Sequence, residues 1–149
     1  MSINATKLGR GLVAAGALLA LTAGTAFAGG KIAVITPYLA QPGTQFYVES
    51  FEAAAKDNGW SVNVIDTKGD VAAVVSRLED AATQKVDAVV INVDPAQVGA
   101  GLEAVKAAGI PAFGMDAGQS PLLVTNVTSN GYAMAADTAA YVANRINGK

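Results

Sequence analysis

Side chains that could bind a hydroxyl-rich ligand follow the apolar segments of this sequence. The set consists of Tyr38, Gln41, Thr44, Gln45, Asn92 and Asp116. An amide or a carboxylate can bond two neighbouring hydroxyl groups at once, and a desolvated carboxylate makes the stronger, charge-assisted hydrogen bonds. An aromatic ring can cover the C–H face of such a ligand. These residue types therefore predict a site for a neutral, polyhydroxylated small molecule.

Each of these residues also has a structural alternative. The Asp116 carboxylate could accept hydrogen bonds from backbone N–H groups of its own loop, and Asn92 could be a turn residue. Tyr38 and Gln41 could be solvated loop residues, and Thr44 could be the N-cap of the first helix. Trp60 follows the helix-ending Gly59 on the far side of the sheet, so we expect it in the core and not at a ligand.

The residue types that are missing exclude several kinds of chemistry. The 149 residues contain no cysteine and no histidine. This removes thiol nucleophiles, disulfides, the usual structural zinc sites and every Ser-His-Asp or Cys-His arrangement. No G-x-x-x-x-G-K-[ST] phosphate loop is present, and Gly99-Ala100-Gly101 falls inside a predicted helix, where it favours a packing role. We therefore expect no catalytic residue, no metal and no cofactor.

The composition is that of one folded domain. The chain is 52% hydrophobic and has a formal net charge of −2. A chain of this length can bury a core large enough to fold unaided. It has no basic patch, which argues against a nucleic-acid partner.

Strand and helix patterns alternate along the sequence. Apolar or alternating segments predict strands at 31–36, 61–66, 86–92, 110–115 and 122–127. Helical periods predict helices at 45–58, 71–82, 95–108 and 129–146, with Asp70 and Asp94 as N-caps. This order predicts an α/β fold with a doubly wound, three-layer parallel sheet. Ligands bind beyond the carboxyl ends of such strands, so the loop 37–45 is the first candidate binding surface.

Residues 1–28 have the pattern of a secretory signal peptide. Lys7 and Arg10 precede an apolar stretch, and Ala26-Phe27-Ala28 matches an A-x-A cleavage site. The mature chain would then begin near Gly29. The alternative is a membrane anchor, because the uncharged stretch 11–30 is just long enough to span a bilayer.

From Lys31 onwards the sequence resembles the type I periplasmic binding proteins of the ribose and galactose/glucose kind. The resemblance rests on KIAVITPYLAQP, FEAAAKDNGW, VDAVVINVDPAQVGAGLEAVKAAGIPAFGMDAG and VTSN. It implies that Asn92 and Asp116 contact a sugar. The aromatic residues of the family's first loop are absent at Gln41–Thr44, so Tyr38 or Phe46 would replace them. The arginine that follows the family's aspartate is Ala117 here.

The resemblance also implies a role and a division of the chain. Residues 29–149 would be the N-terminal lobe of a two-lobed protein, with the second lobe absent from this sequence. The chain would be the solute-binding component of an ABC importer in the periplasm, taking a sugar or polyol to a membrane permease. The further expected partner is the missing second lobe or, through self-association, another copy of this chain. The alternative is a periplasmic sensor that signals to a membrane chemoreceptor or kinase. An enzyme or a transcriptional regulator on the same fold has less support, because no nucleophile–base pair or helix-turn-helix is visible.

Overall fold

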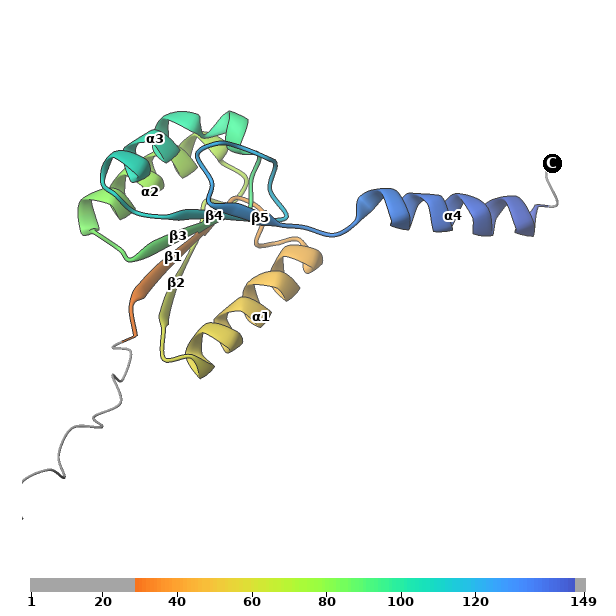
Figure 1. Cartoon of the computed structure of the whole chain (residues 1–149), viewed down its shortest axis with the longest axis horizontal. Helices are drawn as coiled ribbons and strands as arrows, with labels where there is room; N and C mark the ends of the chain where they lie inside the picture. The colour runs from red at the N-terminus through yellow and green to blue at the C-terminus, as the bar shows by residue number, and fades with distance from the viewer. Residues whose placement is uncertain (1–28, 147–149) are drawn as a thin grey trace, which may run out of the picture.

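The fold is a single parallel sheet with helices on both faces, as predicted (Figure 1). The computed structural model describes residues 29–146, and the predicted leader lies outside them. The sheet has the strand order β2-β1-β3-β4-β5, and each neighbouring pair is parallel. The strands are β1 (Lys31–Thr36), β2 (Ser61–Asp66), β3 (Ala88–Ile91), β4 (Ala112–Met115) and β5 (Thr125–Val127). The helices are α1 (Pro42–Asp57), α2 (Val71–Gln84), α3 (Gly99–Ala107) and α4 (Gly131–Arg145), with a 3-10 turn at Pro95–Gln97.

One face of the sheet carries most of the core. Helices α2 and α3 cover it, and their apolar stripes meet alternate residues of β1, β3 and β4 (Figure 1). Ile35, Ile91 and Leu102 are completely buried in this layer. Gly101 of α3 lies directly against Leu78 and Val75 of α2. This confirms the predicted packing role for Gly101, because a side chain at this position would collide with α2.

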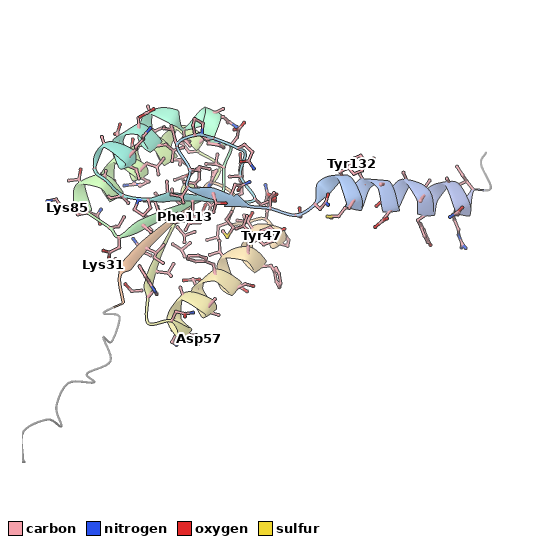
Figure 2. All side chains as sticks on the ribbon, viewed as in Figure 1. Lys31, Tyr47, Asp57, Lys85, Phe113 and Tyr132 are labelled. Carbon is pink, nitrogen blue, oxygen red and sulfur yellow. The ribbon has the colours of Figure 1, made fainter. Side chains whose placement is uncertain are left out.

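The opposite face is covered less completely. The core layer on this side contains the buried residues Val34 and Val90 of the sheet and Val48 of α1. Phe113 and Met115 of β4 pack against this layer and are only partly buried. Helix α1 is the helix on this side, and it packs over β2 (Figures 1 and 2). The apolar surface of β4 on this face is therefore only partly shielded from water.

Most differences from the predicted boundaries have a local cause. Helix α1 begins at Pro42 and not at residue 45, because proline suits the first helical position, and Gln41 occupies the N-cap position. Asp94 caps the 3-10 turn as predicted, accepting from the N–H of Ala96, but α3 itself starts only at Gly99. Strand β5 is shorter than predicted. Leu122 and Leu123 precede it and pack onto the core from a turn.

Trp60 is not part of either core cluster, so the prediction of a core position was wrong. It is half-buried and lines a small apolar hollow of about 230 Å³ with Ile32 and Phe51, at the amino edge of the sheet. This edge is opposite to the one where the strands end, so Trp60 lies far from the predicted ligand site.

Helix α4 differs from the other helices because none of its residues is buried. It leaves the sheet after β5 and extends away from the rest of the fold, with Tyr132 near its start (Figures 1 and 2). The side chain of Asn130 caps it by accepting from the N–H of Ala133 at 3.0 Å. Within residues 29–146, no helix has both the length and the apolar composition that crossing a bilayer requires.

Candidate functional site

A hollow of about 480 Å³ lies at the carboxyl ends of β1, β3 and β4. Five of the six predicted site residues line it, and they are Tyr38, Gln41, Thr44, Asn92 and Asp116. They come from three separate segments of the chain, which follow β1, β3 and β4. They meet here because parallel strands end at the same edge of the sheet.

Asn92 joins three of these segments through its side-chain amide. Its Oδ1 accepts hydrogen bonds from the hydroxyls of Thr36 and Thr44, each at 3.2 Å, and its Nδ2 donates to the carbonyl of Met115 at 2.6 Å. The residue is only 6% exposed. The two acceptor positions of Oδ1 are therefore occupied, and one N–H of Nδ2 has no hydrogen-bond partner among the described residues.

Thr44 is not the N-cap of α1, so that structural alternative is wrong. It lies inside the first turn of the helix, is buried, and directs its hydroxyl to Asn92. Gln41 occupies the N-cap position but makes no capping hydrogen bond with its side chain. Its exposed amide is therefore available at the rim of the hollow.

Tyr38 belongs to the turn between β1 and α1. Its N–H donates to the hydroxyl of Thr36, its carbonyl accepts from the N–H of Gln41, and its half-buried ring packs against the core. The ring is thus fixed beside the hollow. Phe46, the other aromatic residue considered for this role, is 68% exposed and does not line the hollow.

Asp116 directly follows β4 and has a left-handed backbone conformation, with φ of 51°. Its N–H donates to the carbonyl of Val127 at 2.7 Å, and its Oδ1 accepts from the hydroxyl of Thr128 at 2.6 Å. Among the described residues its carboxylate accepts no backbone N–H. This argues against the structural alternative, and it leaves Oδ2 without a hydrogen bond to a described residue.

Gln45 is the one predicted site residue outside the lining. It is exposed in the first turn of α1, where its N–H donates to the carbonyl of Gln41. The structure adds Val93, Asp94, Ala117 and Gly118 to the wall. All four residues come shortly after β3 or β4 in the sequence, and this position could have predicted them. Asp94 already had a structural explanation as an N-cap, and its Oδ1 does accept from the N–H of Ala96.

The charged residues that line the hollow are all acidic. Asp94 and Asp116 both line the hollow, and in the described part of the chain no lysine or arginine does. The same part of the chain holds no group of three acidic residues arranged to bind a metal ion. The arrangement can therefore accept hydrogen bonds from hydroxyl groups, and it repels anions.

The sequence profile of the periplasmic binding protein domain matches residues 32–149. The chain therefore belongs to the periplasmic binding protein family, and membership of this family implies a periplasmic location. No curated protein matches the sequence. The family and the structural neighbours described below are solute-binding proteins and not enzymes, as the sequence predicted.

Several solved structures share this fold. An ABC sugar transporter subunit from Rhodobacter sphaeroides matches with a TM-score of 0.71 and 22% identity, over 80% of this chain and 43% of its own. A solute-binding protein from Agrobacterium vitis with bound allitol gives 0.72 and 23%, over 82% and 42%. The 5-methylthioribose transporter solute-binding protein from Thermotoga lettingae, in complex with 5-methylthioribose, gives 0.72 and 19%, over 80% and 38%. At these identities the likeness shows the fold, and this chain spans about two fifths of each neighbour.

Proposed function

We propose that this protein is a periplasmic solute-binding component of an ABC importer and that its ligand is a sugar or polyol. The observation that carries the proposal is the hollow at the strand ends, where Tyr38, Gln41 and Asp116 present a ring, an amide and a carboxylate together. Structural neighbours with bound allitol and 5-methylthioribose support the same class of ligand.

The role of each residue follows from its side-chain donors and acceptors that form no hydrogen bond within the described part of the chain. Asp116 would accept ligand hydroxyls at Oδ2, and the exposed amide of Gln41 would bond a further hydroxyl. Asn92 would donate its remaining N–H, while its Oδ1 holds Thr36 and Thr44 in place. The fixed ring of Tyr38 would cover a C–H face of the ligand.

The two carboxylates define which solutes would be rejected. An anionic sugar acid brought beside Asp94 and Asp116 meets like charges with no cation on this wall. A neutral sugar or polyol carries no such penalty and supplies the hydroxyl donors that carboxylates need. We therefore expect the site to prefer glucose over gluconate.

A binding panel tests the proposal. D-ribose, D-glucose, allitol, myo-inositol and gluconate would be titrated into the purified protein and followed by NMR, which detects millimolar binding. The expected result is that at least one neutral compound shifts the resonances of Asn92 and Asp116, while gluconate does not. Shifts confined to residues far from the hollow, or preferential binding of gluconate, would contradict the proposal.

The same proposal includes a second lobe and a membrane permease as partners of this chain. We expect this chain to act as one lobe, residues 29–149, whose ligand is enclosed by a second lobe, and to deliver the solute to a membrane permease. Genes for a permease and an ATPase beside this one would support the importer. A neighbouring chemoreceptor or kinase gene would favour the sensor instead.

A further inference from the structure

The segment between β5 and α4 is bonded directly to the residue that we expect to bind the ligand. Thr128 donates its hydroxyl to Oδ1 of Asp116 at 2.6 Å, a length typical of a charge-assisted O–H···O⁻ bond. The two residues are separated by 12 positions in the sequence. We propose that Thr128 is a positioning residue, which fixes the Asp116 carboxylate so that Oδ2 faces the ligand. This inference rests on the proposed function.

The backbone of Asp116 shows why its side chain needs such a partner. The residue adopts φ of 51°, a conformation that residues other than glycine adopt uncommonly and that often marks functional sites. The bond from its N–H to the carbonyl of Val127 holds this backbone in place. The side chain is exposed, so packing does not restrict its rotation. The Thr128 hydroxyl is therefore the contact that selects one orientation.

Asn126 secures the neighbouring residue in the same way. Its Oδ1 accepts from the N–H of Ala117 at 3.1 Å, and its Nδ2 donates to the carbonyl of Ala117 at 3.2 Å. A Cβ at Gly114 would collide with Oδ1 of Asn126, so the glycine makes room for this amide. Asn126 and Thr128 are two positions apart, the spacing of side chains on one side of a strand. Together they hold the Asp116–Ala117 backbone and carboxylate against the end of β5.

The arrangement connects ligand affinity to the segment that leads into α4. Thr128 lies between the last residue of β5 and the Asn130 cap of α4. A change of backbone angle in this segment would move the Thr128 hydroxyl away from Oδ1. The carboxylate would then sample other rotamers and lose part of its preorganisation for the ligand.

The first test measures the carboxylate itself and needs no ligand. NMR couplings across the Cα–Cβ bond of Asp116 report whether one rotamer or several are populated. We expect one rotamer in the native chain and in Thr128→Ser, which keeps the hydroxyl, and averaged couplings in Thr128→Val. Thr138→Val is the matched control, since its hydroxyl bonds only the Met134 carbonyl within α4. An unchanged single rotamer in Thr128→Val would overturn the inference, whether or not any sugar binds.

The second test is a double-mutant cycle on binding of the best ligand among ribose, glucose, allitol and myo-inositol. Thr128→Val should weaken binding by about three- to tenfold, and Thr128→Ser should restore it. In an Asp116→Ala background the Thr128→Val change should have no further effect, because the carboxylate that it positions is gone. An equal loss in both backgrounds would contradict the inference while leaving the proposed function intact. If no compound of the panel binds, the proposed function fails and the coupling measurement alone decides.

Discussion

At the scale of single residues, Asn92 and Asp116 have opposite physical situations although both line the hollow. Asn92 is buried and has three hydrogen bonds to protein groups. Asp116 is exposed and bonds one hydroxyl. Substitution of Asn92 should therefore affect mainly stability, and substitution of Asp116 should affect mainly binding.

Asn92→Ala should lower the free energy of unfolding by about 2–4 kcal/mol. The change leaves the hydroxyls of Thr36 and Thr44 and the carbonyl of Met115 without their partner, in a buried place where water does not easily replace it. Asn63→Ala is the control, because Asn63 lies exposed on β2. Urea denaturation would measure both variants. Equal stability of Asn92→Ala and the native chain would show that these bonds contribute nothing net.

Asp116→Asn should weaken ligand binding by about 1.5–3 kcal/mol, the contribution typical of hydrogen bonds to a charged group. The amide oxygen can still accept from Thr128, so the free energy of unfolding without ligand should change by less than about 0.5 kcal/mol. Asp66→Asn serves as the control, since Asp66 likewise lies at the carboxyl end of a strand. Its Oδ1 accepts from the N–H of Lys68, but the residue does not line the hollow. A large loss of stability with unchanged affinity would instead assign Asp116 a structural role.

At the scale of elements, the contact between α2 and α3 depends on a helical glycine. A Cβ at Gly101 would lie 2.8 Å from Cβ and Cδ1 of Leu78 and 3.1 Å from Cα of Val75. The two helices approach closely because position 101 has no side chain. Helix α3 follows the 3-10 turn at Pro95–Gln97, and this turn comes directly after Asp94 of the wall. Pro95 itself lies close to Gly118 of the wall.

Gly101→Ala should lower the free energy of unfolding by about 1–3 kcal/mol, because the added methyl forces the two helices apart. Gly99→Ala provides a matched control in the same helix, since nothing lies within 4 Å of a Cβ at that position. That variant should keep or slightly raise stability, by up to about 1 kcal/mol, because alanine favours helix. Thermal denaturation compares the two. Equal effects of both changes would show that the helix contact does not depend on the glycine.

At the scale of the whole molecule, the apolar surface is incompletely covered. Helix α4 and its C-cap Ile146 carry apolar residues at alternating spacings of three and four, which places them on one stripe. These residues are Tyr132, Ala135, Ala139, Val142 and Ile146. None of these residues is buried, and Tyr132 is 86% exposed. The β4 surface on the α1 side is also only partly covered. Exposed apolar patches of this kind favour association.

We therefore expect the purified chain to be folded but prone to self-association. Sedimentation velocity should show dimers or larger species at micromolar concentration. Replacing Tyr132 and Val142 with glutamate should shift the distribution towards monomer. The same changes at Met134 and Tyr141, which lie about a third of a turn away from this stripe on α4, should have a smaller effect. A well-behaved monomer with native α4 would contradict this expectation.

The affinity of the chain alone should be low. If a two-lobed protein binds its sugar with a Kd of about 1 μM, or about −8 kcal/mol, a wall that supplies half of this free energy binds near 1 mM. Calorimetry with the sugars and polyols of the panel measures the value. Micromolar binding by this chain would mean that it needs no second wall.

We expect residues 1–28 to be removed when the protein is exported. We expect the mature protein to begin at or beside Gly29, because Ala26-Phe27-Ala28 follows an apolar stretch with Lys7 and Arg10 before it. Intact-mass measurement of periplasmic material decides this. A membrane-bound species that still contains residues 1–28 would show that the segment is an anchor.

The sequence by itself determined the alternation of strands and helices, the α/β class and most of the residues at the hollow. These features are local, since the period of apolar residues and the caps Asp70 and Asp94 depend on a few neighbouring positions. A parallel sheet then brings its strand ends together at one edge. Five of the six predicted residues could thus be placed at one site without coordinates.

Only the tertiary structure decided what each of these side chains does. That Asn92 bonds Thr36, Thr44 and Met115 depends on strand order and register, which local patterns do not specify. The bond from Thr128 to Asp116 likewise requires β5 to lie beside β4 in the observed register. The same holds for α4, whose apolar stripe resembles that of a packed helix in sequence. Whether such a stripe is buried depends on where the chain turns after β5, and here it turns away from the sheet (Figure 1).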